Sequence, residues 1–329
     1  MFDIITFGSA TQDIIITPKK LTVLKYEKTP DNNQNVCFPV GSKLELEDIK
    51  FLGGGGGANA AVTFAKQGFK TAFCGAIGDD KAGKEVIDSL KKMTVNVALV
   101  VKKNERPTNQ SVVISGEGQD RTIFAHRGAA ELMSKDEIPW KKLKAKWLYL
   151  APLGGAMAET FEDLVSFAKE QNIKVVANPG IAQLSLSNFP EIAKKLDVLF
   201  LNQEEASFLT KISIEKESEI FARLYQMCKG VAVMTKGGQG VLASDGKYIY
   251  SAVPNPNRKV VDTTGAGDSF ASGFLVDYIN YQGDIEKGIQ MGLANSEANL
   301  SEIGAQTGLL KKGTEITRVF VKKEPCLTQ

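Results

Sequence analysis

Residues 262–274 read Asp-Thr-Thr-Gly-Ala-Gly-Asp-Ser-Phe-Ala-Ser-Gly-Phe, and this stretch is the most informative part of the chain. Phe270, Phe274 and Tyr278 recur there at helical spacing. The pattern predicts a glycine-containing loop that leads directly into an amphipathic helix.

The start of this helix predicts a binding site for negative charge. N–H groups in the first turn of a helix have no intrahelical partner, and the helix dipole favours an anion there. We therefore predict an anion hole formed by Gly265, Ala266 and Gly267, with the carboxylate of Asp268 in the same turn. An anion hole beside a base is the combination that phosphoryl transfer to a hydroxyl requires. The alternative is an ordinary capped helix with an acidic first turn.

A second glycine-rich segment lies far upstream, where residues 53–57 are all glycine and Ala-Asn-Ala-Ala follows. The two segments resemble the two signature motifs of the ribokinase-like (PfkB) family of sugar and nucleoside kinases, in the same order. The resemblance extends from Gly8 to about Gly308. It implies one kinase domain over residues 1–329, with Asp268 as the base that deprotonates the acceptor hydroxyl.

The resemblance also assigns residues to the acceptor, the substrate that receives the phosphoryl group. These are Asp13, Gly55, Gly56, Gly57 and Asn59. Two departures from ribokinases weaken the case for ribose. A ribokinase lysine is replaced by Gly56, and a ribokinase carboxylate is missing from residues 151–155, Ala-Pro-Leu-Gly-Gly.

For the nucleotide, the resemblance implies contacts from Asn202, Thr235, Gly237, Gly238, Gly240 and Asn295. It implies that Glu205 holds Mg²⁺ through water, because Mg²⁺ keeps several waters and takes few direct carboxylates. It also implies a monovalent cation, such as K⁺, beside Asp262 and Thr264. The alternatives are a plain helix start at residues 202–205 and a hairpin turn at residues 235–240.

Composition excludes several other classes. The 329 residues are 43% hydrophobic and 24% charged, and the net charge is only +2, so neither disorder nor a nucleic-acid or membrane partner is indicated. No apolar run has the length of a membrane span, and we expect a strand, not a signal peptide, at the N-terminus. Four scattered cysteines and a single histidine, His126, argue against zinc and predict free thiols in the cytoplasm.

Strand-like and helix-like patterns alternate along the chain. Helices are expected at residues 59–66, 160–170 and 217–229, and buried strands at residues 4–7, 71–77, 147–150, 175–177, 198–201 and 231–235. This predicts an α/β fold with a doubly wound, mostly parallel sheet flanked by helices. Residues 14–52 and 97–127 break the rhythm with β-branched runs and with turns at residues 30–33 and 116–118. By the resemblance they form a small β-sheet lid that carries a homodimer surface.

Two nucleotide-binding motifs are rejected. Residues 78–85 have the spacing of a P-loop, but Glu85 replaces the required Ser or Thr, and two aspartates would repel phosphate. A helix start with acids in its first turn is the better interpretation. A dinucleotide-binding motif needs GxGxxG after the first strand, where this chain has the isolated Gly8.

The sequence therefore predicts a kinase that uses ATP and Mg²⁺ to phosphorylate a hydroxymethyl group of a small sugar. A nucleoside acceptor stays open, with Phe38 and Phe124 as candidates to stack on a base. A non-catalytic sensor is disfavoured because it would normally have lost Asp268. His126 is a weaker candidate for an acceptor contact.

Overall fold

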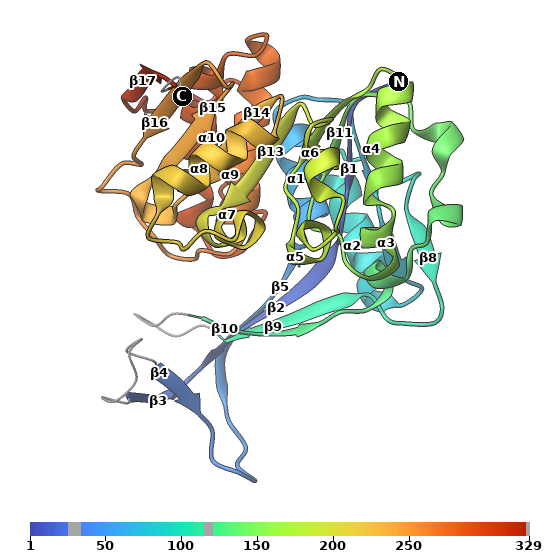
Figure 1. Ribbon diagram of the computed structural model, residues 1–329. Coiled ribbons are helices and arrows are strands. Elements are labelled where there is room, and N and C mark those ends of the chain that lie inside the picture. The colour runs from blue at the N-terminus through green and yellow to red at the C-terminus, as the bar shows by residue number, and fades with distance from the viewer. Residues whose placement is uncertain (26–33, 115–120, 327–329) are drawn as a thin grey trace.

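The computed structural model describes residues 1–25, 34–114 and 121–326. Its body is a nine-stranded sheet (Figure 1). From one edge the order is β17 (Val321–Pro325), β16 (Tyr248–Ala252), β15 (Val241–Ser244), β14 (Val231–Thr235), β13 (Val198–Asn202), β12 (Lys174–Ala177), β11 (Ala145–Leu150), β1 (Phe2–Phe7) and β6 (Thr71–Cys74). The strands from β6 to β14 are parallel, and β15, β16 and β17 are antiparallel. The predicted fold class is confirmed.

Helices cover both faces of this sheet, because alternate strand residues point to opposite sides. In β1, Ile5 and Phe7 pack in the same core cluster as Leu164, whereas Ile4 packs in the cluster of Phe64 and Phe274. The first face carries α3 (Gly155–Glu159), α4 (Phe161–Glu170), α5 (Ile181–Leu184), α6 (Phe189–Ala193), α7 (Gln203–Thr210) and α8 (Glu217–Met227). The second carries α1 (Gly56–Lys66), α2 (Lys81–Lys92), α9 (Ala266–Asn280) and α10 (Ile285–Leu300). Short 3₁₀ helices are η1 (Ala129–Leu132), η2 (Lys135–Glu137), η3 (Trp140–Lys142) and η4 (Gly237–Gln239).

A second sheet projects from the body, and we call it the lid (Figure 1). It consists of β10 (Thr122–His126), β9 (Asn109–Ile114), β2 (Thr11–Pro18) and β5 (Leu46–Gly54), in that order. The hairpin of β3 (Thr22–Lys25) and β4 (Gln34–Cys37) lies beyond its far end. The turns predicted at residues 30–33 and 116–118 lie outside the described residues.

The first part of the predicted second lid segment is not in the lid. Residues 97–108 belong to the body: β8 (Val101–Lys103) pairs with β7 (Ala76–Gly78), and Leu99 is buried in the core. A β-branched run indicates a strand but not which sheet it joins, which explains the error.

The polar C-terminal residues extend the large sheet. Residues 322–325 belong to β17, which pairs with β16, and Lys323 lies 4.1 Å from the ring centre of Tyr248. Backbone pairing with an edge strand does not need apolar side chains. Among the described residues, no helix is both long and apolar enough to cross a membrane.

Candidate active site

The loop before α9 has the backbone that an anion-binding helix start needs. Gly265 caps α9 at φ 78°, and a Cβ there would lie 2.6 Å from the Cβ of Ala305, so only glycine fits. Gly267 is open, because nothing outside its own helix backbone and chain neighbours lies within 4 Å of the place a Cβ would occupy. The N–H of Ala266 donates to Thr263 at 3.3 Å. The start of α9 can therefore bind an anion at Gly267. That Gly265, Ala266 and Gly267 together form an anion hole stays a prediction.

Asp268 is joined to two distant segments by side-chain amides. Asn59 of α1 donates from Nδ2 to Oδ2 of Asp268 at 2.8 Å, and Gln306 donates from Nε2 to Oδ1 of Asn59 at 3.1 Å. Burial raises the pKa of Asp268, and the hydrogen bond from Asn59 partly opposes that shift. A carboxylate held in this way is positioned to accept a proton. Sequence reasoning missed Gln306, which lies in a loop without a motif.

Asp262 is committed to hydrogen bonds within the protein. It accepts from the N–H of Thr264 at 2.9 Å, from Oγ1 of Thr264 at 2.7 Å and from the N–H of Gly304 at 2.8 Å. The guanidinium of Arg121 lies 3.3 Å away. Burial raises the pKa of Asp262, but the hydrogen bonds from Thr264 and Gly304 and the charge of Arg121 together outweigh burial and lower the pKa. The monovalent cation beside Asp262 and Thr264 stays a prediction, and a cation there would adjoin a guanidinium.

A cavity of about 470 Å³ lies between the lid and the body, and we call it the acceptor cavity. Its polar lining comprises Ser9, Thr11, Asp13, Asn109, Gln110, Ser111, His126, Arg127, Glu131 and Thr264. Phe38 and Phe124 are not among its lining residues, whereas Ile123 and Ala125 are. The structure therefore does not support base stacking by those two rings.

Asp13, a predicted acceptor residue, lies in the lid and not in the body of the protein. The first strand, β1, ends at Phe7. A short connection leads from it to β2, which contains Asp13 and belongs to the lid. Its carboxylate accepts a hydrogen bond from Ser111. Burial raises the pKa of Asp13 despite that bond. One face of the lid thus brings a buried carboxylate into the acceptor cavity.

The five-glycine run packs the lid against the start of α1. Gly55 has φ 92°, and a Cβ there would lie 2.6 Å from the carbonyl oxygen of Ser9. A Cβ at Gly57 would lie 2.9 Å from the backbone of Gly8. At Gly56, where ribokinases carry lysine, a Cβ would lie 3.4 Å from Oδ1 of Asp268. The missing lysine would therefore have been beside the base.

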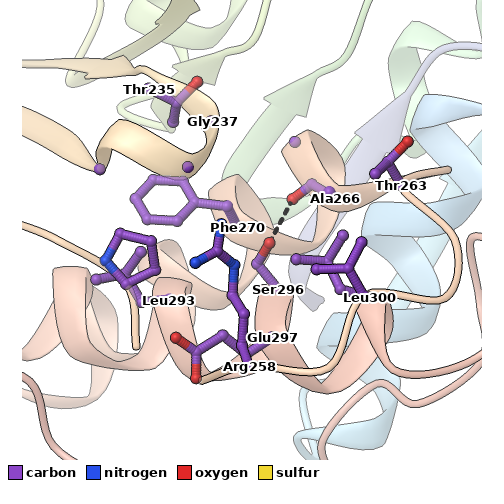
Figure 2. Close-up of a pocket in the computed structure, with 15 residues that line it drawn as sticks. Thr235, Gly237, Arg258, Thr263, Ala266, Phe270, Leu293, Ser296, Glu297 and Leu300 are labelled. Carbon is purple, nitrogen blue, oxygen red and sulfur yellow. Dashed lines mark hydrogen bonds between the residues drawn. The ribbon is translucent and has the colours of Figure 1, made fainter. Parts of the chain in front are cut away.

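A second cavity, of about 260 Å³, lies on the other side of the start of α9, and we call it the nucleotide cavity (Figure 2). It gathers four of the predicted nucleotide residues, namely Thr235, Gly237, Gly238 and Gly240, with Ala266 and Gly267. Its apolar lining includes Phe270, Leu293 and Leu300. A glycine loop, a helix start and an apolar wall fit the phosphates and the base of ATP.

Four polar residues of the nucleotide cavity were not among the predicted nucleotide contacts: Arg258, Thr263, Ser296 and Glu297. Arg258 lies against the glycine loop, since a Cβ at Gly238 would be 3.0 Å from its guanidinium. Arg258 follows a loop with no motif, and Ser296 and Glu297 belong to a helix whose pattern indicates only packing.

The prediction for Asn295 is corrected. Asn295 is fully buried, donates to the carbonyl of Ser269 at 2.8 Å and accepts from the N–H of Leu310 at 2.9 Å. Its side chain joins α10 to α9 and does not line the nucleotide cavity. Leu293, two residues earlier on α10, faces that cavity instead.

Asn202 and Glu205 form a capping box at the start of α7. This is the alternative interpretation of residues 202–205 as a plain helix start. Oδ1 of Asn202 accepts from the N–H of Glu205 at 2.7 Å, and Glu205 accepts from the N–H of Asn202 at 2.9 Å. Burial raises the pKa of Glu205, and the charge of Asp268 adds to the shift, so the two carboxylates belong to one electrostatic site. No group of three or more metal-ligating side chains occurs in the described part of the chain. A magnesium ion held through water by Glu205 stays a prediction.

The rejected P-loop is a capped helix. Asp80 accepts from the N–H of Gly83 at 2.7 Å at the start of α2 and also binds the N–H of Thr108. The carboxylate thus occupies the place where a P-loop would bind phosphate.

A doubly wound α/β body, a β-sheet lid and two cavities that meet at the start of α9 define the class of small-molecule kinases with this fold. Residues 1–312 match the family model described as pfkB family carbohydrate kinase. The chain therefore belongs to the pfkB family, whose members are phosphotransferases with an alcohol group as acceptor.

Known relatives differ in their acceptors. The chain is 26% identical over 278 residues to a ribokinase of Haemophilus influenzae, covering 82% of this chain and 88% of the relative. It is 25% identical over 283 residues to a nucleoside kinase of Methanothermobacter thermautotrophicus, covering 83% and 86%. The crystal structure of a ribokinase from Thermotoga maritima matches with a TM-score of 0.73 at 25% identity, covering 95% of this chain and 97% of that one.

Proposed function

We propose that this protein is an ATP- and Mg²⁺-dependent kinase that transfers the γ-phosphoryl group to a hydroxymethyl group of a sugar. The observation that carries the proposal is the position of α9. Thr263, just before the helix, lines the nucleotide cavity, and Thr264 lines the acceptor cavity. Asp268 in the first turn thus lies where the contents of the two cavities would meet.

In the proposed reaction, Asp268 accepts the proton of the acceptor hydroxyl. The bond from that oxygen to the γ-phosphorus forms as the bond from the γ-phosphorus to the β–γ bridging oxygen breaks, and ADP leaves. The first-turn N–H groups of α9, from the predicted hole of Gly265, Ala266 and Gly267, stabilise negative charge on the phosphoryl oxygens. Bound Mg²⁺ supplies further charge neutralisation, and Glu205 with Asn202 would hold it through water. A K⁺ beside Asp262 and Thr264 remains part of the proposal.

Binding roles follow from the two cavities. We assign the donor to Thr235, Gly237, Gly238 and Gly240, and the acceptor to Asp13 and the segment of Gly55, Gly56 and Gly57. Asn59 contacts the base itself, so we assign it to positioning Asp268 as well as to the acceptor. Closure of the lid would exclude water and suppress hydrolysis of ATP.

A nucleoside is the second candidate acceptor. The acceptor cavity has an apolar wall that includes Val113, Ile123 and Met157, which could contact a base. The match to a nucleoside kinase supports the same candidate. A non-catalytic sensor is less well supported, because Asp268 is retained with its positioning partners.

We also propose that the lid forms a homodimer. Residues directly opposite one another in a sheet share a face, and Phe51, Ile14, Val112 and Phe124 form such a row across the four strands of the lid. Phe51 and Phe124 are each 58% exposed. A row of this kind is typical of a surface that a partner covers.

The four cysteines are free, which supports the proposed cytoplasmic location.

The direct test is a panel of sugars and nucleosides assayed for ADP release with Mg-ATP. At least one acceptor should give turnover far above the rate without acceptor, and Asp268→Asn should abolish the difference. An Asp268→Asn variant that is as active as the wild type with every accepted compound would contradict the proposed reaction.

A further inference from the structure

A charged cluster lies at one end of the acceptor cavity. Glu131 of η1 faces two arginines: Arg127 lies 3.8 Å from its Oε1 and Arg106 lies 3.6 Å from its Oε2. Glu131 and Arg127 line the cavity, as does the neighbouring His126, whereas Arg106 is not among the lining residues. None of these residues has a role in the proposed phosphoryl transfer.

The cluster lies away from the base, along one wall of the acceptor cavity. Pro152 adjoins the place where a Cβ of Gly56 would lie, which is itself beside Asp268. Two residues further on, a Cβ at Gly154 would lie 3.4 Å from Oε1 of Glu131 and 3.7 Å from a guanidinium nitrogen of Arg127. Two residues of extended chain span roughly 7 Å. A monosaccharide that presents a hydroxymethyl group to Asp268 would therefore reach the cluster with its other end.

Gly154 has no side chain and leaves the wall of the cavity open beside the cluster. Residues 151–155, Ala-Pro-Leu-Gly-Gly, carry no charged side chain. The charge beside Gly154 comes from Glu131 and from the two arginines that it faces. Guanidinium groups as well as a carboxylate therefore determine the charge at this end of the cavity.

The charge distribution is unequal along the cavity. Two arginines and one glutamate leave a net positive charge at the far end, whereas the near end has the carboxylates of Asp13 and Asp268. Arg106 lies outside the cavity and can neutralise Glu131, so Arg127 is available to a ligand. A guanidinium at such a position favours a carboxylate or phosphate, which it can bind with two parallel hydrogen bonds.

We infer that the acceptor is a sugar derivative with an anionic group, carboxylate or phosphate, at the end opposite the phosphorylated hydroxymethyl. Arg127 binds that group, and Glu131 orients Arg127. This inference rests on the proposed kinase function and narrows its substrate class.

Matched pairs of acceptors test the inference in the full-length protein with Mg-ATP. Gluconate is compared with glucose, and fructose 6-phosphate with fructose, together with five- and six-carbon aldonates and ketoaldonates. At least one anionic member should exceed its neutral partner tenfold or more in kcat/KM. Preference among carboxylates or among phosphates distinguishes a sugar acid from a sugar phosphate. A neutral sugar used better than every anionic one would overturn the inference.

Variants separate charge recognition from general damage. Arg127→Gln should lower kcat/KM for the anionic acceptor by roughly 10- to 150-fold, the range for losing a hydrogen bond between charged groups, and change neutral acceptors less than threefold. Glu131→Gln should lower kcat/KM for the anionic acceptor less than Arg127→Gln does, because the glutamine oxygen can still accept a hydrogen bond from Arg127 and orient it. Arg106→Gln is the matched control, with a smaller effect. Equal losses for charged and neutral acceptors in Arg127→Gln would contradict the assignment.

The outcomes also distinguish this inference from the proposed function. Turnover of neutral sugars alone, abolished by Asp268→Asn, would refute the anionic acceptor and retain the kinase. Turnover that Asp268→Asn leaves intact would refute the proposed reaction itself.

Discussion

Asn59 and Asp268 are 209 residues apart in the chain, yet the amide of Asn59 donates to the carboxylate of Asp268 at 2.8 Å. The two residues lie in the first turns of α1 and α9, each of which follows a glycine-rich segment. The two signature motifs of the sequence therefore meet in one hydrogen bond. Each glycine segment helps to bring its helix start close enough for that contact.

Removal of the proposed base should affect catalysis far more than binding. Asp268→Asn or Asp268→Ala should reduce kcat by roughly 10²- to 10⁴-fold, the usual effect of losing a general base, with little change in the KM for ATP. Steady-state kinetics with a good acceptor measures this. Asp277→Asn, at the other end of α9, is the matched control and should leave kcat nearly unchanged. A kcat above a third of the wild-type value in Asp268→Asn would disprove the assignment.

The raised pKa of Asp268 should be visible in the pH dependence of activity. The base must be ionised to accept a proton, so kcat/KM should fall as pH decreases through a value above the ordinary pKa of aspartate, about 3.9. An acidic limb at or below the ordinary pKa of aspartate would contradict a raised pKa for Asp268.

The same shift predicts a cost in stability. Because the folded-state pKa is higher than the unfolded one, the charge of Asp268 destabilises the fold increasingly as pH rises between the two values, and constantly above both. Asp268→Asn should therefore have a higher Tm than the wild type at pH 7 to 8, and the difference should shrink in acid. Thermal unfolding at several pH values checks this, and equal Tm values at pH 8 would refute it.

Gln306 should act through Asn59. Its amide donates to Oδ1 of Asn59 and thereby keeps the NH₂ group of Asn59 directed at Asp268. In Gln306→Leu, Asn59 can rotate and present its oxygen, so kcat should fall roughly 5- to 150-fold, as for a lost buried hydrogen bond. The acidic limb of the pH–rate profile should also move to higher pH, because the Asp268 carboxylate loses a hydrogen-bond donor. A lower kcat with an unchanged pH profile would indicate a purely structural role.

Asp13 should serve the acceptor and not the nucleotide. Asp13→Ala should lower kcat/KM for the acceptor by roughly 5- to 150-fold, because it leaves buried polar partners unsatisfied. The KM for ATP should barely change. Asp48→Ala, an exposed position on the same lid, is the control. A higher KM for ATP with unaltered acceptor kinetics would reverse our assignment of the two cavities.

The lid row of Phe51 and Phe124 should hold a dimer together. Light scattering across a concentration series should give the mass of two chains for the wild type, and Phe51→Asp with Phe124→Asp should shift it to one. Substitution of an exposed apolar side chain elsewhere, such as Phe320→Asp (83% exposed in the wild type), should not. A wild type that remains monomeric at every concentration would refute the proposal.

The local part of the site could be predicted from sequence. The glycine loop, the helix start and Asp268 are continuous in the chain, so their relative geometry follows from backbone rules alone. The parallel strands were equally accessible, because buried strands are short apolar runs. Residues 97–108 were misassigned because strand propensity does not specify a partner strand.

Residues that reach the site through tertiary packing could not be predicted. Gln306, Arg258 and Glu131 lie in segments without a motif, and only the folded chain brings them to the cavities. Asn295 shows the opposite error: a polar residue at an expected position was taken for a ligand contact, whereas its amide satisfies backbone groups in the core.

The lid is joined to the body at one end of its strands. Thr11 and Gly54 are the last paired residues of β2 and β5, and beyond them the chain enters the loop of Ser9 and the start of α1. Asp13, Ser111 and Ala125 lie opposite one another on β2, β9 and β10, close to this base, and all three line the acceptor cavity. The row that faces the acceptor therefore belongs to the part of the lid that is tied most directly to the body. The far end of the lid, with the hairpin of β3 and β4, can vary in length and sequence without changing the side chains that meet the acceptor.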